Sequence, residues 1–99
     1  MTKQKTILIV DDHPLFREGL KTIIGRNPGY DVIGEAGSGR EALKMIKKLR
    51  PDLVLLDISL PDQSGIDLIG DIRHASFRTR VIIISMHSKI DYIVTVSYT

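Results

Sequence analysis

Apolar residues in this chain gather in short continuous runs that alternate with longer stretches of mixed character. Three runs consist almost wholly of Ile, Leu and Val, and they span 6–10, 53–56 and 81–84. A short uninterrupted apolar run is typical of a strand buried on both faces of a parallel sheet. A fourth run, 31–36, is more polar and predicts a strand at the edge of that sheet. The pattern therefore predicts four strands.

The stretches between these runs carry apolar residues at helical spacing. The three sets are Leu15, Phe16, Leu20, Ile23 and Ile24; Ala42, Leu43, Met45, Ile46 and Leu49; and Ile66, Leu68, Ile69 and Ile72. Pro14 favours the first turn of the first helix, residues 38–41 form a Ser-x-x-Glu capping box for the second, and Ser64 can cap the third. Strands that alternate with helices predict an α/β fold with a doubly wound parallel sheet and right-handed crossovers.

Carboxylates follow two of the predicted buried strands. Asp11 and Asp12 come directly after the first strand, and Asp57 ends the strand that begins at Leu53. Open α/β sheets bind ligands beyond the carboxyl ends of their strands, so these acids are expected in one crevice if the two strands are neighbours. Carboxylates this close repel one another unless a cation is present, and Mg²⁺ prefers such hard oxygen ligands.

A carboxylate beside a metal can also act as a nucleophile towards a phosphoryl donor. Asp57 is the first candidate for this role, and the Ser85 hydroxyl, at the end of the fourth strand, is placed to donate to a phosphoryl oxygen. The alternative is that each aspartate merely caps a helix or forms a turn, and for any single one the two interpretations are about equally probable. Acids after two strands and a hydroxyl after a third favour a functional site.

Composition narrows the class of protein. The 99 residues allow one domain, and 42% hydrophobic with 26% charged residues is ordinary globular composition. The net charge is only +2 and the basic residues are scattered along the sequence, which argues against nucleic-acid binding by this chain. The chain has no cysteine, no apolar leader at its start and no segment long enough to span a membrane, so we expect a cytoplasmic protein.

Three segments together resemble a known family. ILIVDDHPLFREGL from Ile7, LVLLDISLPDQSGIDL from Leu53 and VIIISMHS from Val81 resemble the receiver domain of two-component response regulators. The Asp-Asp-His-Pro start is similar to the LuxR-type (NarL/FixJ) subfamily, whose receivers precede a helix-turn-helix output domain. The resemblance covers about 5–90 and implies a flavodoxin-like, CheY-like fold. The combination of motifs is far more specific than a single loop motif.

The resemblance also implies a role for each candidate residue. Asp57 matches the phosphoacceptor, Asp12 a direct Mg²⁺ ligand, and Asp11 a ligand that acts directly or through water. Ser59 would lend its backbone carbonyl to the metal, and Ser85 matches the switch hydroxyl. A sensor histidine kinase would supply the phosphoryl group, and the full-length protein would regulate transcription. The chain itself would be a regulatory domain and not an enzyme acting on a separate substrate.

The end of the sequence departs from the family pattern. A receiver has a fourth helix, a fifth strand with a lysine that pairs with the phosphoryl group, and a fifth helix, whereas this sequence stops at Thr99. We therefore expect residues 1–99 to be a receiver domain without its fifth strand and fifth helix. The family favours a helix from Ile90, with fraying after Val94, while the β-branched and aromatic residues of 92–98 favour a strand. A strand here would have to pair antiparallel or with another molecule.

Two functions from different classes remain open. The first is a phosphorylation switch that acts through Asp57. The second is a receiver-fold interaction module that forms a homodimer or higher assembly through an exposed sheet edge or its tail, and that is phosphorylated poorly or not at all. A phosphatase with an aspartate nucleophile is a third, weaker interpretation, since no second general acid is evident. His13 is interpreted as a solvated residue at a helix start rather than a ligand.

Overall fold

A computed structural model of the chain describes residues 4–57, 60, 62, 65–86 and 92–98, and of 65, 66, 85, 86 and 92–98 it describes the backbone. Strands and helices alternate from the start of the chain. The elements are β1 (Lys5–Val10), α1 (Pro14–Gly25), β2 (Tyr30–Ala36), α2 (Gly39–Leu49), β3 (Leu53–Asp57), α3 (Gly65–Ala75), β4 (Arg80–Met86) and β5 (Tyr92–Tyr98).

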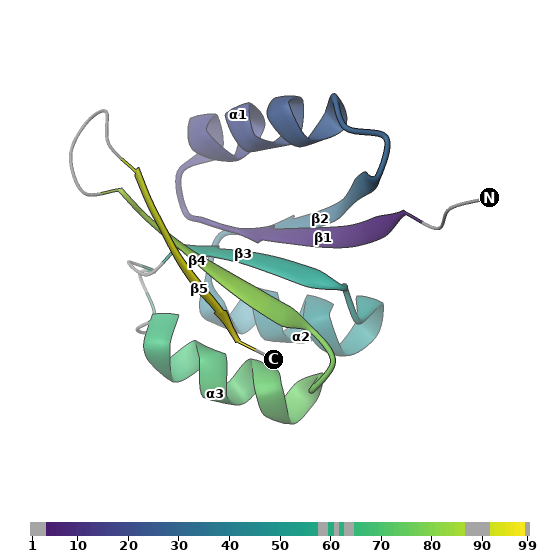
Figure 1. The fold of residues 1–99 in the computed structure, drawn as a ribbon. Coiled ribbons are helices and arrows are strands. Elements are labelled where there is room, and N and C mark those ends of the chain that lie inside the picture. The colour runs from purple at the N-terminus through teal and green to yellow at the C-terminus, as the bar shows by residue number, and fades with distance from the viewer. Residues whose placement is uncertain (1–3, 58–59, 61, 63–64, 87–91, 99) are drawn as a thin grey trace.

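The strands form one sheet in the order β2-β1-β3-β4-β5, in which the first four strands are parallel. Helix α1 covers one face of the sheet, and α2 and α3 cover the other (Figure 1). This arrangement confirms the predicted doubly wound α/β fold, with the more polar β2 at an edge. Within the part of the chain that the structure describes, there is no fifth parallel strand and no fifth helix.

The main core lies between the sheet and the pair α2 and α3. It contains side chains from β1, β3 and β4, which alternate towards this face, and their partners on the two helices. The fully buried members include Leu8, Val54, Leu56, Ile46 and Ile72. Burying such side chains supplies about 1.5–3 kcal/mol each, and this fixes the two helices against the central strands.

The start of α2 shows how local sequence sets an element boundary. Ser38 is the N-cap, and its hydroxyl accepts a hydrogen bond from the Glu41 amide at 3.2 Å. The Glu41 carboxylate reaches back and accepts from the Gly37 amide at 3.0 Å. The Ser-x-x-Glu capping motif is therefore present, with its return contact one residue earlier than in the usual form.

The tail of the chain corrects one expectation. The helix favoured by the family pattern is wrong for residues 92–98, which form β5 and pair antiparallel with β4 from Val81↔Tyr98 to Met86↔Tyr92. The β-branched and aromatic composition of this segment favours a strand, and pairing gives the apolar β4 a partner for its backbone groups. The strand alternative, with antiparallel pairing, is the one that the structure has.

Candidate functional site

The carboxyl ends of β1 and β3 bring two aspartates to the same edge of the sheet. The two strands are neighbours in parallel register, and Val10 pairs with Leu56. The next residue on each strand is therefore an aspartate, Asp11 after β1 and Asp57 at the end of β3. Both are nearly buried, with relative exposures of 4% and 9%. The sheet topology thus explains why residues 46 positions apart share one site.

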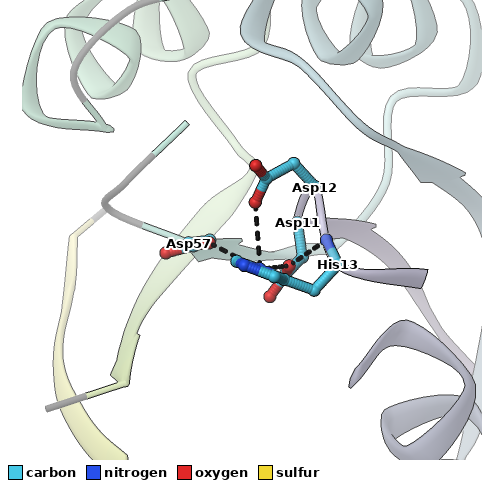
Figure 2. Close-up of side chains that lie close together, drawn as sticks. All are labelled: Asp11, Asp12, His13 and Asp57. Carbon is cyan, nitrogen blue, oxygen red and sulfur yellow. Dashed lines mark hydrogen bonds and ion pairs between the residues drawn. The ribbon is translucent and has the colours of Figure 1, made fainter. Parts of the chain in front are cut away.

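Asp12 and His13 complete a cluster with these two residues. One ligand atom from each of Asp11, Asp12, His13 and Asp57 lies within 4.8 Å of all the others. Figure 2 shows the four side chains converging on one small region, with three of them coming from the β1–α1 turn. The structure therefore brings together the three aspartates that the sequence singled out, and it adds a histidine.

His13 contacts the acids more closely than the sequence suggested. Its Nδ1 lies 2.9 Å from Asp11 Oδ1, 3.0 Å from Asp12 Oδ1 and 3.8 Å from Asp57 Oδ2. The hydrogen bond to Asp11, helped by the charges of the other acids, raises the pKa of His13 above its ordinary value. His13 stands at the start of α1 with a half-exposed side chain, as the sequence predicted, and its contacts with the acids add to that description.

Asp12 offers an oxygen that lies in ion-pair contact with His13 but accepts no hydrogen bond from the described residues. Its Oδ1 is buried and accepts no hydrogen bond from the described residues, although His13 Nδ1 is 3.0 Å away. A ring N–H points at one acceptor at a time, and the hydrogen bond of Nδ1 goes to Asp11 Oδ1. This oxygen and the carboxylates of Asp11 and Asp57 together form a set of hard donors that fits Mg²⁺.

A second set of charges holds the turn that carries Asp11 and Asp12. Arg17, on α1, donates from Nη1 to the backbone carbonyl of Asp11 and from Nε to Glu35 Oε1 at 2.9 Å. Lys21 Nζ also contacts Glu35, at 2.6 Å. The lysine, and after it the arginine, lower the pKa of the Glu35 carboxyl below its ordinary value. Arg17 therefore ties the end of β1 to α1 and β2.

Sequence reasoning missed this role of Arg17. Its partners lie 6 and 18 positions away, so no local motif joins them. One signal was present, because Arg17 stands one helical turn after His13 and lies on the side of α1 nearest the acids.

Two candidate residues are only partly placed, or not placed at all. Ser85 belongs to β4 and follows Ile84, which pairs with Asp57, so its backbone lies at the same end of the sheet as the acids. Its side chain is outside the described part of the structure. Ser59 also lies outside the described residues.

The parallel strands β2-β1-β3-β4 have helices on both faces, and aspartates cluster at the carboxyl ends of β1 and β3. This combination defines an α/β protein with a CheY-like fold and an acidic site. The chain matches the response regulator receiver domain over residues 7–98. It belongs to this family.

Among curated relatives, the nitrate/nitrite response regulator protein NarL of Escherichia coli strain K12 is 36% identical over 90 residues, which are 91% of this chain and 42% of that protein. The chemotaxis protein CheY of Thermotoga maritima is 44% identical over 82% of this chain and 67% of its own length. This chain thus spans less than half the length of NarL.

A solved structure shows the same architecture. The two-component response regulator of the LuxR family from Aurantimonas sp. SI85-9A1 superposes with a TM-score of 0.81 at 38% identity, over 87% of this chain and 61% of that chain. These likenesses confirm the family resemblance that the three sequence segments indicated. In the described part of the chain, no helix has both the length and the apolar character needed to cross a bilayer.

Proposed function

We propose that this chain is a phosphorylation switch in which Asp57 accepts a phosphoryl group. Asp11 and Asp12 hold Mg²⁺ together with Asp57 and the backbone carbonyl of Ser59, and the Ser85 hydroxyl responds to the phosphoryl group. Residues 1–99 act as a receiver domain in the cytoplasm, and a sensor histidine kinase or a small phosphodonor supplies the group. The family is regulatory, which agrees with a switch rather than an enzyme with its own substrate.

One observation carries the proposal. Three carboxylates from two neighbouring strands converge within 4.8 Å, and one of their oxygens has no hydrogen-bond donor among the described residues. Protein interiors rarely leave a buried carboxylate oxygen without a hydrogen bond, so this oxygen, whose contact among the described residues is the ion pair with His13, favours a ligand. The arrangement would cost stability through mutual repulsion if it served the fold alone.

The chemistry follows from the positions of these groups. When bound, Mg²⁺ neutralises the clustered charge and withdraws electron density from phosphoryl oxygens. An oxygen of the Asp57 carboxylate forms a bond to phosphorus while the bond between phosphorus and the donor's nitrogen or oxygen breaks. The donor atom keeps the electron pair. The side chain of Asp57 is 11% exposed, so a small part of it reaches solvent.

The output of the switch is inferred from the relatives. This chain covers 42% of NarL, and the resemblance to LuxR-type receivers implies a helix-turn-helix domain after the receiver. We infer that regulation of transcription passes through such a domain in a full-length protein, and that this chain makes no direct contact with nucleic acid.

The test uses acetyl phosphate and Mg²⁺ followed by intact mass measurement. The wild-type chain is expected to gain the mass of one phosphoryl group, and the Asp57→Asn variant is expected to gain none. Asp52→Asn is the matched control, because Asp52 stands just before the same strand and is an acid at its opposite end. An adduct that persists in Asp57→Asn, or a wild-type chain without any adduct, refutes the proposal.

A second candidate, a homodimer or higher assembly of this chain, is favoured by the sheet edge. Strand β5 is an outermost strand, and its seven residues include no charged side chain that would discourage pairing with another strand. Light scattering at increasing protein concentration tests this candidate. A mass that stays at one chain throughout argues against it.

A further inference from the structure

Asp62 makes two hydrogen bonds to a helix far away in the sequence. Its Oδ1 accepts from the Gly39 amide at 2.8 Å, and its Oδ2 accepts from the Arg40 amide at 3.0 Å. Gly39 and Arg40 are the first two residues of α2, and the two contacts span 23 and 22 positions of the chain. One carboxylate thus binds two adjacent helix amides with both of its oxygens.

These contacts complete the capping of α2. The first amides of a helix have no partner within the helix and need an acceptor from elsewhere. Ser38 already serves the Glu41 amide, so its hydroxyl and the Asp62 carboxylate share the task. The Gly39 amide, followed by the Arg40 amide, lowers the pKa of Asp62, so this carboxyl is ionised at neutral pH. A negative charge at a helix N-terminus is also favoured by the helix dipole.

Asp62 lies close to the proposed phosphoacceptor in the sequence, so its contacts also bear on that site. Asp62 comes five residues after Asp57, the proposed phosphoacceptor. Between them, the Leu60 side chain is buried in the main core. The chain that leaves β3 is therefore anchored at Asp57 by the sheet, at Leu60 by the core and at Asp62 by α2.

We propose that Asp62 is a positioning residue for the phosphorylation site, which it serves by fastening the chain that follows Asp57 to the N-terminus of α2. This inference rests on the proposed function, because Asp57, from which that chain leaves, is the proposed phosphoacceptor. Helix α2 is a firm anchor, since its Ala42 and Ile46 are fully buried. Loss of the Asp62 contacts leaves the position of Asp57 to the sheet and to Leu60 alone, so Mg²⁺ binding must supply part of the ordering that Asp62 provided.

The experiment compares three variants in one background. Asp62→Ala removes both acceptors, Asp62→Asn keeps one oxygen acceptor without the charge, and Ser38→Ala removes the local cap of the same helix without touching the chain after β3. Three quantities are measured on each: the hydrogen exchange rates of the Gly39 and Arg40 amides, the Mg²⁺ dissociation constant from amide chemical shifts, and the rate of phosphorylation by acetyl phosphate at saturating Mg²⁺.

Asp62→Ala is expected to speed exchange at both amides and to weaken Mg²⁺ binding about tenfold, the lower end of the range for groups that support metal ligands. The phosphorylation rate of Asp62→Ala should fall as well, and the rate of Asp62→Asn should lie between those of Asp62→Ala and the wild type. Ser38→Ala should lower the melting temperature by about 4–8 °C, as expected for a lost cap in a domain of this size, and leave the Mg²⁺ affinity unchanged.

Two outcomes overturn the inference in different ways. If Asp62→Ala and Ser38→Ala lose stability alike and both keep the wild-type Mg²⁺ affinity, Asp62 is only a helix cap and the proposed function stands. If the wild-type chain neither binds Mg²⁺ nor forms the adduct, the proposed function fails and the inference fails with it.

Discussion

Strand β3 has an aspartate at each end, and the side chains of these two residues have opposite surroundings. Just before the strand, Asp52 Oδ2 accepts hydrogen bonds from the Thr6 amide at 2.8 Å and the Thr6 hydroxyl at 3.1 Å. The Asp52 amide donates back to the same hydroxyl at 2.9 Å. At the other end, Asp57 lies among further acids and a histidine. Paired donors mark the first aspartate as structural, whereas the clustered acids around the second agree with the role proposed for Asp57.

Further hydrogen bonds hold the residues that precede the amino-terminal end of β3. Thr79 is almost fully buried, and its hydroxyl donates to the Pro51 carbonyl at 2.7 Å. The Ser76 hydroxyl is 2.7 Å from Thr79 Oγ1 and is placed to donate to it. These contacts fasten the end of α3 and the start of β4 to the residues that precede β3. Every polar group in this network has a partner, which is the pattern of a site built for stability.

The largest effect is expected for Thr79→Val. The change keeps the shape of the side chain but leaves the buried Pro51 carbonyl and the Ser76 hydroxyl without a partner, which costs about 1–3 kcal/mol of the free energy of unfolding. Urea unfolding monitored by circular dichroism measures the loss, and Mg²⁺ affinity should not change. A loss below about 0.5 kcal/mol, the ordinary scatter for a surface change, means that the network is not structural.

Asp12→Asn, in the acid cluster, should not lower the stability of the metal-free protein as Thr79→Val does. Its effect on the free energy of unfolding should change sign when Mg²⁺ is added. Without a divalent cation the variant should be at least as stable as the wild type, because one of the clustered charges is gone. With free Mg²⁺ at ten times the wild-type dissociation constant, the wild type should gain about 1.4 kcal/mol and the variant much less. Thermal unfolding with and without Mg²⁺ checks this reversal.

The control for that reversal is a monovalent salt at the ionic strength of the Mg²⁺ buffer, which separates binding from screening of surface charge. If Asp12→Asn lowers stability without metal and Mg²⁺ stabilises both proteins equally, Asp12 is a structural residue like Asp52. The contrast between the two ends of β3 would then be lost.

A smaller effect is expected for Asp52→Ala, at the structural end. The variant loses the acceptor for the Thr6 amide and hydroxyl, and because the site is exposed, water replaces part of the interaction. We expect a loss of about 1 kcal/mol in the free energy of unfolding, measured in urea at neutral pH. Phosphorylation by acetyl phosphate should proceed as in the wild type. A large drop in phosphorylation would show that the two ends of the strand are not independent.

The same contrast shows how far the sequence could predict this molecule. The four parallel strands and three helices followed from apolar runs and helical spacing, and the position of Asp11 and Asp57 followed from the rule that strand ends meet at one edge. These signals are local, or depend only on the order of elements. The tail was harder, because the composition of 92–98 favoured a strand while the family pattern favoured a helix.

The contacts that the sequence did not predict are the long-range polar ones. Asp62 binds amides more than twenty positions away, and Asp52 binds Thr6 across 46 positions. Nothing in the neighbourhood of either aspartate distinguishes it from an ordinary turn residue. The partners appear only when the sheet order and the path of the chain after β3 are known. The sequence therefore singled out Asp11, Asp12 and Asp57, and the structure shows that their surroundings differ from those of Asp52 and Asp62.

The smallest effect on the free energy of unfolding is expected at Glu35. This residue lies near the acid cluster, yet it is paired with basic side chains, as Asp52 is paired with donors. It contacts Arg17 and Lys21, and its pKa is lowered from the ordinary value of 4.5, chiefly by Lys21. A carboxyl whose pKa is lower in the folded state contributes stability above its unfolded pKa and loses it as the pH falls through the folded value. The Glu35 side chain is 31% exposed, so solvent screening limits the gain to about 0.5 kcal/mol.

Glu35→Gln should therefore be about 0.5 kcal/mol less stable than the wild type at pH 7, and the difference should shrink as the pH falls below 4.5. Urea unfolding at pH 7 and at pH 3.5, each at low and high salt, measures the gap. High salt should narrow it at pH 7, because the charges are partly exposed. A gap that is the same at both pH values would show that packing of the Glu35 side chain, and not its charge, holds β2 against α1. Arg17 would then reach Asp11 without help from a paired acid, and the difference between paired and clustered carboxylates would not extend beyond the two ends of β3.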